Sequence, residues 1–277
     1  MDQKSFFSHY PERKKDSNKY DNGVVAFLSG SYGMAGAAYY NLIGARSVGA
    51  SYVHSYLPDS IYPIVATNEM SAVYHPYNDS KTDIFPQTAF NKLKAIGVGS
   101  GINNLPHQKK YLEYIINFAD IPTIVDAQGL KILSENDELF SYSDKLILTP
   151  HLGEFSILSG LSTDQIMKDR VNIASKYAKE KGVILVLKGP ETLVVSKEGE
   201  VHVNDSGNEV LARAGSGDVL CGMLTGMCAL YEDPYQACID GVWLHGHLAD
   251  VYAAGKGTEI FDLSLYPTLA ADFFGRR

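Results

Sequence analysis

The stretch AGSGDVLCGMLTGMCAL, residues 214–230, joins a glycine-bearing turn to a run of apolar and small residues. The run is apolar nearly all round, which predicts a helix buried in the core, and its small residues let it approach other elements closely. The first turn of such a helix presents free backbone N–H groups and the positive end of the helix dipole. Gly215 and Gly217 leave that backbone open to an anion, and Ser216 is placed to cap the helix.

Asp218 is the most informative residue of this turn, because it brings a carboxylate to a place suited to phosphate. One interpretation is a general base that accepts the proton of a hydroxyl attacking a terminal phosphoryl group, while the N–H groups stabilise the developing charge. The other is a plain capping aspartate in a tight turn. The pentapeptide 214–218 alone does not separate them, since short glycine-rich motifs have many false matches.

Upstream of this turn, short aliphatic runs alternate with glycine-bearing or polar turns and helical-looking segments. The runs are 24–28, 94–98, 122–125, 145–148 and 183–187. Near-continuous apolar runs of this length predict a parallel sheet buried on both faces, which defines an α/β fold. Ligands of such sheets gather beyond the carboxyl ends of the strands, where each of these turns lies.

Local signals predict further elements between residues 162 and 203. Ser162 and Gln165 fit a capping box, an amphipathic helix follows to residue 181, and Gly182 suits the position after its end. The runs 192–195 and 201–203 flank a charged glycine turn and predict a hairpin. No repeat or linker divides the chain, so we expect one domain over 21–277 preceded by an N-terminal arm, 1–20.

Composition excludes several classes of protein. The chain has 277 residues and a formal net charge of −8, which argues against a general binder of nucleic acid or membrane surfaces. Cys221, Cys228 and Cys238 show neither disulfide nor metal-site spacing, so we expect buried free thiols. The N-terminus lacks the apolar core of a signal peptide and no apolar run is long enough to span a membrane, so we expect a cytoplasmic protein.

Seven motifs occur in an order that resembles the NAD(P)H-hydrate dehydratase family. They are GSYGMAGAA (30–38), GVGSG (97–101), VDAQGL (125–130), LTPHLGEF (148–155), VLKGPETLVV (186–195), AGSGDVLCGMLTG (214–226) and GVWLHGHLAD (241–250). The string from Arg13 to Gly23 also looks like that family's N-terminal arm. The resemblance implies a ribokinase-like three-layer sandwich, with a mostly parallel central sheet and helices on both faces.

The resemblance implies a two-stage repair reaction. A nucleotide phosphorylates the hydroxyl that water has left on the nicotinamide ring of (6S)-NADHX or (6S)-NADPHX, and loss of phosphate restores NADH or NADPH. ADP, which we favour over ATP, would give AMP and phosphate, with Mg²⁺ as cofactor. Relatives commonly form homo-oligomers, and an epimerase acting on the other hydrate form would be a separate chain, since no such domain fits this length.

The same resemblance assigns residues to roles. Asp218 is the base, and Gly215, Ser216 and Gly217 form the anion hole. The hydrate is bound by Ala37, Gly101, His151 and Asp218, and the nucleotide by Lys188, Gly189, Pro190, Glu191, Thr192 and Gly217. Glu154 is the candidate to organise Mg²⁺ through water, as similar acidic positions do in related kinases.

Each assignment has a structural alternative. The Lys188 ammonium could end its strand by snorkelling to solvent, His151 could be a satisfied turn histidine, and Ala37 could serve helix packing. The family usually shows Asp-Ala-Asp where this chain has Asp126-Ala127-Gln128, which weakens any claim of a metal bound there by two acids.

Two other functions remain open at this stage. A vitamin or sugar kinase of the same fold would use the same base and anion hole. A nucleotide-sensing protein that has lost catalysis is a second alternative, which the retained Asp218 disfavours.

Overall fold

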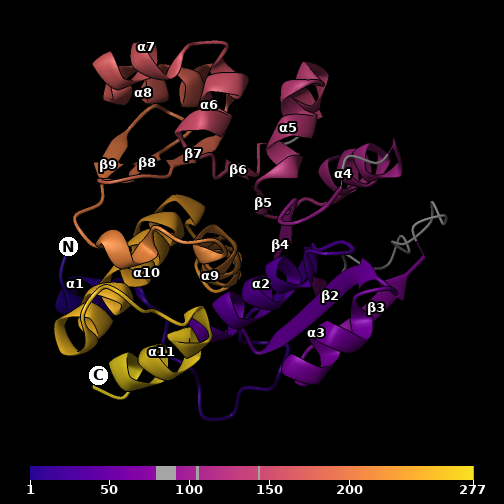
Figure 1. Ribbon diagram of the computed structural model, residues 1–277, viewed down its shortest axis with the longest axis vertical. Helices are drawn as coiled ribbons and strands as arrows, with labels where there is room; N and C mark the ends of the chain where they lie inside the picture. Colours follow the sequence, from indigo (N-terminus) through magenta and orange to yellow (C-terminus); the bar gives the residue numbers. More distant parts are fainter. Residues whose placement is uncertain (79–91, 104–105, 143, 277) are drawn as a thin grey trace.

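One nine-stranded sheet organises the computed structural model, which describes residues 1–78, 92–103, 106–142 and 144–276 (Figure 1). Its strands lie in the order β3-β2-β1-β4-β5-β6-β7-β8-β9. All neighbouring pairs from β3 to β7 are parallel, and β8 pairs antiparallel with both β7 and β9. The strands are β1 (Val24–Leu28), β2 (Tyr52–Pro58), β3 (Val73–Tyr77), β4 (Ala95–Val98), β5 (Thr123–Val125), β6 (Leu146–Leu148), β7 (Ile184–Leu187), β8 (Leu193–Val195) and β9 (Val201–Val203).

The five aliphatic runs of the sequence form β1, β4, β5, β6 and β7, and the predicted hairpin forms β8 and β9. Strands β2 and β3 were not anticipated. Their sequences, YVHSYLP and VYHPY, carry histidine, tyrosine and proline, and they occupy one margin of the sheet. Proline and polar side chains are tolerated at such an edge, so the apolar signal of a central strand is lacking there.

Helices cover both faces of the sheet, as the three-layer prediction requires (Figure 1). The α-helices are α1 (Gln3–His9), α2 (Ala35–Ser47), α3 (Tyr62–Asn68), α4 (Pro106–Phe118), α5 (Gln128–Ser134), α6 (Leu152–Ser159), α7 (Thr163–Lys168), α8 (Arg170–Lys181), α9 (Ser216–Cys228), α10 (Pro234–Lys256) and α11 (Tyr266–Phe274). Short 3₁₀ turns are η2 (Asp137–Tyr142), η3 (Glu209–Leu211) and η4 (Leu263–Leu265).

Alternate residues of the strands feed two separate cores. Val25 and Phe27 of β1 face the core built with α1, α2, α3, α9, α10 and α11, whereas Val24 and Ala26 face the core built with α4 to α8. This period of two follows from the pleat of a strand buried on both faces. The predicted mostly parallel sheet with helices on both faces is therefore confirmed.

The predicted helix between residues 162 and 181 is divided into two. Its start is confirmed, because Ser162 and Gln165 form the capping box, and its end is confirmed, because Gly182 adopts a left-handed φ of 65°. The prediction of one continuous helix is wrong. Asp169, with φ −151° and ψ 52°, ends α7 and precedes α8. After the break α8 begins with Arg170, whose side chain reaches the β7–β8 turn.

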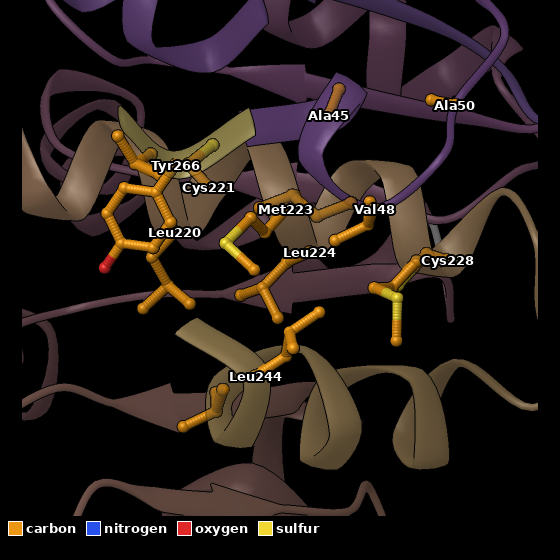
Figure 2. Close-up of a cluster of buried hydrophobic side chains, with 14 of the residues drawn as sticks. Ala45, Val48, Ala50, Leu220, Cys221, Met223, Leu224, Cys228, Leu244 and Tyr266 are labelled. Atoms are coloured by element: carbon orange, nitrogen blue, oxygen red, sulfur yellow. The ribbon is translucent and has the colours of Figure 1, made fainter. Parts of the chain in front are cut away.

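Helix α9 lies in the core between α2 and α10, with buried side chains on all sides (Figure 2). Glycines make the crossing with α2 possible. A Cβ on Gly44 would lie 2.3 Å from the carbonyl oxygen of Val219, and one on Gly222 would lie 2.2 Å from that of Asn41. The prediction of a buried helix able to approach its neighbours closely is confirmed.

The N-terminal arm contains α1, which packs against the C-terminal part of the chain. Phe6 is fully buried, and its ring lies 5.7 Å from Trp243 of α10 and 5.3 Å from Phe273 of α11. The three cysteines are buried and free, as predicted. Within the described residues, no helix is both long and apolar enough to cross a membrane. The domain boundary at residue 20 stays a prediction.

Candidate functional site

The start of α9 lies beside the carboxyl ends of the parallel strands. Gly215 occupies the N-cap position with φ 93°, and no side chain caps the helix. A Cβ on Gly215 would lie 2.6 Å from the ring of Tyr40 on α2, so both conformation and space require glycine. The prediction that Ser216 caps α9 is wrong, because the turn places it inside the helix as its first residue.

Asp218 stands in the first turn of α9 on the side facing α2 and β4. The Asn41 amide donates a hydrogen bond to the Asp218 carbonyl at 2.8 Å and another to the Ser100 hydroxyl at 3.3 Å. These two bonds anchor the first turn of α9. Burial, reinforced by the nearby Asp126 carboxylate, raises the pKa of Asp218 to about 6, although Lys188 and a hydrogen bond from Ser100 oppose the rise. A carboxylate with such a pKa is largely ionised at neutral pH and is well matched to accepting a proton there.

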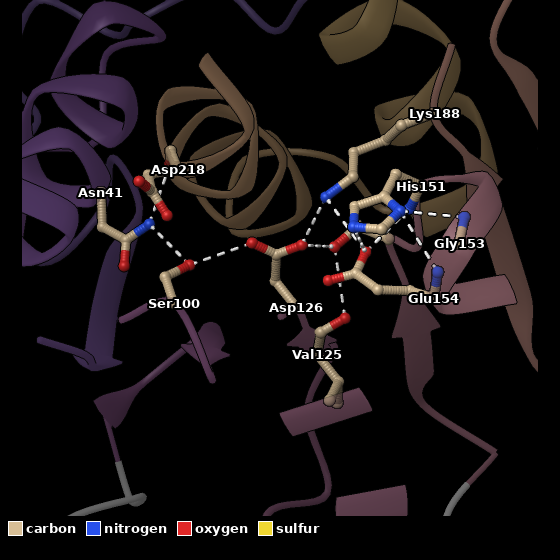
Figure 3. Close-up of polar contacts among 10 residues, drawn as sticks. Asn41, Ser100, Val125, Asp126, His151, Gly153, Glu154, Lys188 and Asp218 are labelled. Carbon is tan, nitrogen blue, oxygen red and sulfur yellow. Dashed lines mark hydrogen bonds and ion pairs between the residues drawn. The ribbon is translucent and has the colours of Figure 1, made fainter. Parts of the chain in front are cut away.

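Asp126 lies at the centre of the polar network in Figure 3, directly after β5, and is 2% exposed. Its carboxylate accepts hydrogen bonds from Ser100 at 3.2 Å, Thr149 at 2.8 Å and Lys188 at 2.7 Å. These partners follow β4, β6 and β7. One buried carboxylate thus connects the ends of four strands, and its negative charge is compensated by a charged donor.

Lys188 follows β7 and directs its ammonium inward. Nζ lies 3.9 Å from Glu154, and a Cβ on Gly217 would lie 3.4 Å from it, which places the charge beside the first turn of α9. Burial alone lowers the pKa of Lys188, but Asp126 and Glu154 more than offset this and hold the pKa above its ordinary value. The ammonium therefore stays protonated and is not a strand end snorkelling to solvent.

His151 and Glu154 form a reciprocal cap at the start of α6. The His151 Nδ1 accepts from the N–H groups of Gly153 at 3.0 Å and Glu154 at 3.2 Å, while Glu154 accepts from the His151 N–H at 2.8 Å. His151 Nδ1 is thus an acceptor, and Nε2 lies 3.6 Å from the Glu154 carboxylate. The His151 side chain is 62% exposed.

Ala37 and Gly101, both predicted to contact the hydrate, are brought together. A Cβ on Gly101, where φ is 66°, would lie 2.5 Å from the Ala37 Cβ. The Ser31 hydroxyl donates 2.7 Å to the Gly101 carbonyl and fixes this turn. Two segments remote in sequence therefore form one wall of small residues near the α2–α9 crossing.

The turn 189–192 has a tightly specified backbone. Gly189 has φ 150°, Glu191 has φ 52°, and Thr192 links the turn by donating 2.8 Å to the Gly189 carbonyl. Arg170 donates from its two terminal nitrogens to the carbonyls of Pro190 at 2.9 Å and Glu191 at 2.7 Å. The guanidinium thus holds the non-glycine residue in a left-handed conformation that would otherwise be costly.

A cavity of about 1020 Å³ opens on this side of the site. His151, Lys188, the turn 189–192, Ser216 and Gly217 line it, so it brings together most residues predicted for the nucleotide and the anion hole. Ala37, Gly101 and Asp218 are not among its lining residues, whereas His151 is. The volume suits a nucleotide, since ligand pockets generally range over about 300–1,000 Å³.

Several cavity residues were not foreseen. They belong to the segment 203–209, to 211–213, to Leu220 of α9 and to α10, which contributes Val242, His245 and Gly246. Burial lowers the pKa of His245 to about 4, which keeps its ring neutral. The loop lacks a regular pattern, and Arg213 is fixed by bonds to the carbonyls of Val210 and Phe261, both at 2.6 Å, which only the folded chain provides.

Among the described residues, no group of three or more histidine, cysteine, aspartate or glutamate side chains is arranged to hold a metal ion. The Asp126 carboxylate already accepts hydrogen bonds from Ser100, Thr149 and Lys188. The Glu154 carboxylate accepts one from the His151 backbone N–H. Magnesium bound to phosphates usually keeps several waters and needs only one or two carboxylates. Glu154, 19% exposed, fits such a water-mediated role better than direct ligation in a protein cage.

Cys221, three residues after Asp218, is the one cysteine near the site in the described part of the chain. Burial raises the pKa of its thiol, and Asp126 reinforces the rise. The thiol therefore stays protonated and is no nucleophile at neutral pH. The chemistry available is instead proton acceptance by Asp218, anion binding at the start of α9, and charge compensation by Lys188.

Comparison with known proteins gives a consistent result. A family model described as NAD(P)H-hydrate dehydratase matches residues 25–269. The curated ADP-dependent (S)-NAD(P)H-hydrate dehydratase of Neisseria meningitidis serogroup B is 34% identical, over 91% of this chain and 84% of its own length. The chain spans about half the length of the bifunctional NAD(P)H-hydrate repair enzymes that it also matches.

Solved structures agree with this match. A crystal structure of ADP/ATP-dependent NAD(P)H-hydrate dehydratase from Bacillus subtilis, co-crystallised with ATP and Mg²⁺, gives a TM-score of 0.84 at 25% identity, covering 99% of this chain and 97% of that chain. A ribokinase-like superfamily protein from Enterococcus faecalis gives 0.86 at 20% identity, covering 99% and 95%. The second likeness concerns the fold alone and confirms the ribokinase-like architecture.

Proposed function

Because the chain belongs to the NAD(P)H-hydrate dehydratase family, we propose that it uses a nucleotide to dehydrate (6S)-NADHX and (6S)-NADPHX to NADH and NADPH. The observation that carries the proposal is the position of Asp218. Its carboxylate stands in the first turn of α9, beside a cavity large enough for a nucleotide, and its pKa is raised to about 6.

Asp218 starts the reaction as a general base. It accepts the proton of the hydrate hydroxyl while that oxygen attacks the terminal phosphorus of the nucleotide, so ADP leaves as AMP. The phosphorylated hydroxyl then departs as phosphate with the carbon–oxygen electron pair. The lone pair of the ring nitrogen assists this step, and loss of a proton from the neighbouring ring carbon restores the reduced nicotinamide. Phosphate is a far better leaving group than hydroxide, which explains the use of a nucleotide.

The start of α9 stabilises the phosphoryl group during transfer. The backbone of Gly215, Ser216 and Gly217, where the Ser216 N–H also donates to the Arg213 carbonyl at 3.3 Å, and the positive end of the helix form the proposed anion hole. The Lys188 ammonium beside Gly217 adds a full positive charge. The turn 189–192 holds the nucleotide, and its phosphate chain passes Gly217 on the way to Asp218.

The hydrate is proposed to lie on the opposite side, over Ala37 and Gly101. His151 lines the cavity, and its Nε2, which lies 3.6 Å from the Glu154 carboxylate, is the nitrogen that would donate to the hydrate, because Nδ1 is used in the helix cap. Magnesium would accompany the nucleotide, neutralising phosphate charge, with Glu154 as its carboxylate partner through water.

Further parts of the proposal concern the setting of the enzyme. ADP is proposed as the preferred nucleotide, supported by the name of the similar Neisseria protein. We also propose a cytoplasmic homo-oligomer that works with a separate NAD(P)H-hydrate epimerase. The existence of bifunctional repair enzymes among the relatives supports a link between the two activities.

The test is recovery of reduced-nicotinamide absorbance from (6S)-NADHX or (6S)-NADPHX with ADP and with ATP in turn. We expect recovery with stoichiometric release of phosphate and, with ADP, of AMP. A stable phosphorylated vitamin or sugar as the product would instead identify a kinase of the same fold. Nucleotide binding without turnover of a hydrate or a kinase substrate would identify a sensing protein.

A further inference from the structure

The buried Asp126 carboxylate has a position that its role as a salt-bridge partner does not explain. It lies between Lys188, which belongs to the nucleotide side, and Ser100, whose hydroxyl accepts from the same Asn41 amide that donates to the Asp218 carbonyl (Figure 3). Its distances are 2.7 Å to the Lys188 ammonium and 3.2 Å to the Ser100 hydroxyl. The charge of a buried carboxylate must be compensated by hydrogen-bonding or charged partners. Here those partners, Lys188 and Ser100, come from the two sides of the site.

The backbone around Asp126 is held under strain. Ala127, the next residue, has φ 47° and ψ −119°, which a residue with a Cβ rarely adopts. The opposing turn comes so near that a Cβ on Gly99 would lie 1.9 Å from the Asp126 carbonyl oxygen. Strain of this kind persists only where the surrounding structure fixes it, and it gathers at functional sites.

We propose that Asp126 is a positioning residue that anchors the Lys188 ammonium beside the first turn of α9 and, through Ser100, orients Asp218. It touches neither the nucleotide nor the hydrate and acts through these two side chains. The inference rests on the proposed function. It assigns to Asp126 the task of holding the Lys188 ammonium and the Asp218 base in a fixed relation to each other.

The groups around Asp218 determine how the coupling would appear in a pH profile. Asp126 and Lys188 face it from the strand ends, Tyr40 from α2, and Cys221 from the next turn of α9. Asp126 raises the pKa of Asp218, whereas the hydrogen bond of Ser100 lowers it. Removing the charge of Asp126 and removing the hydroxyl of Ser100 should therefore move the acidic limb of the profile in opposite directions.

The experiment compares Asp126→Asn and Ser100→Ala with the exposed control Asp272→Asn on α11. For Asp126→Asn we expect kcat to fall roughly 10- to 100-fold, because Lys188 loses the charged partner that fixes its direction, and the acidic limb to move to lower pH. The affinity for ADP, measured by calorimetry, should be retained or increased, because the asparagine oxygen still accepts from Lys188 while a negative charge has left the anion site. For Ser100→Ala the limb should move to higher pH, and the control should match the wild type.

A merely structural role predicts something else. If Asp126→Asn loses kcat and ADP affinity together, or if both variants keep the wild-type limb, the inference is wrong. If Asp126→Asn does not fold, Ser100→Ala decides, since an unmoved limb contradicts the coupling. Absence of hydrate turnover in the wild type would refute the proposed function instead. The anchoring of Lys188 would still be tested by ADP affinity, because a loss of that affinity in Asp126→Asn would contradict it.

Discussion

On the Asp218 side of the site the residues are buried and packed helix against helix, whereas on the nucleotide side they lie on turns around an open cavity. Asn41 and Ser100 are each 1% exposed, and α2 crosses α9 at glycines. Gly189, Pro190 and Glu191 are exposed, and the Arg170 guanidinium and the Thr192 hydroxyl hold their turn. The side that moves a proton must fix one carboxylate closely, while the other side must admit and release a whole nucleotide.

The largest expected effect comes from the buried side. Asp218→Asn keeps the shape of the side chain but removes the base, so kcat should fall about 10³-fold or more. Binding of ADP, measured by calorimetry, should survive, because the cavity does not include Asp218. A variant that keeps wild-type turnover would show that another group takes the proton.

Gly215→Ala should damage both sides at once. The new Cβ would meet the ring of Tyr40 at 2.6 Å and would force alanine into φ 93°. We expect a stability loss of about 1–3 kcal/mol and kcat/KM lowered roughly 100-fold, read from thermal melts and the absorbance assay. Gly255→Ala on α10 is the matched control, because no atom lies within 4 Å of its Cβ. A variant no worse than this control would mean that the anion turn tolerates side chains.

Arg170→Met should affect the nucleotide side alone. Without its bonds to Pro190 and Glu191 the turn is no longer preorganised, so KM for ADP should rise about tenfold with kcat nearly unchanged. Lys176→Met, on the same helix and 76% exposed, is the control for loss of a cation. A fall in kcat without a change in KM would contradict this division of the site.

The smallest effect concerns pH. Because burial raises the pKa of Asp218 to about 6, kcat/KM should fall as the pH is lowered through 6, where the base becomes protonated. The same rise means that ionising Asp218 destabilises the folded protein above pH 6, an effect absent below its ordinary pKa near 4. Asp218→Asn should therefore melt about 2–4 °C higher than wild type at pH 8 and no higher at pH 4. Equal melting temperatures at pH 8 would contradict the raised pKa.

Local sequence was sufficient where an element is specified by its own residues. The central strands, the capping box at Ser162, the hairpin and the buried helix α9 depend on aliphatic runs, caps and glycines that lie close together in the chain. The edge strand β3 and its neighbour β2 were not predicted, because their sequences carry polar residues and proline and lack the apolar run of a central strand. The break at Asp169 was not predicted, because the hydrophobic periodicity continues through it.

The glycine turn, the carboxylate that follows it and the resemblance that gives both a chemical meaning can all be read from residues that are neighbours in the chain. Long-range packing is what joins Asp126 to Lys188 and Ser100 and brings Arg170 to the nucleotide turn. The reason is physical. Caps and glycine conformations are set within a few residues, whereas the charge, burial and hydrogen bonding around Asp218 come from strand ends up to 118 residues away, such as Ser100.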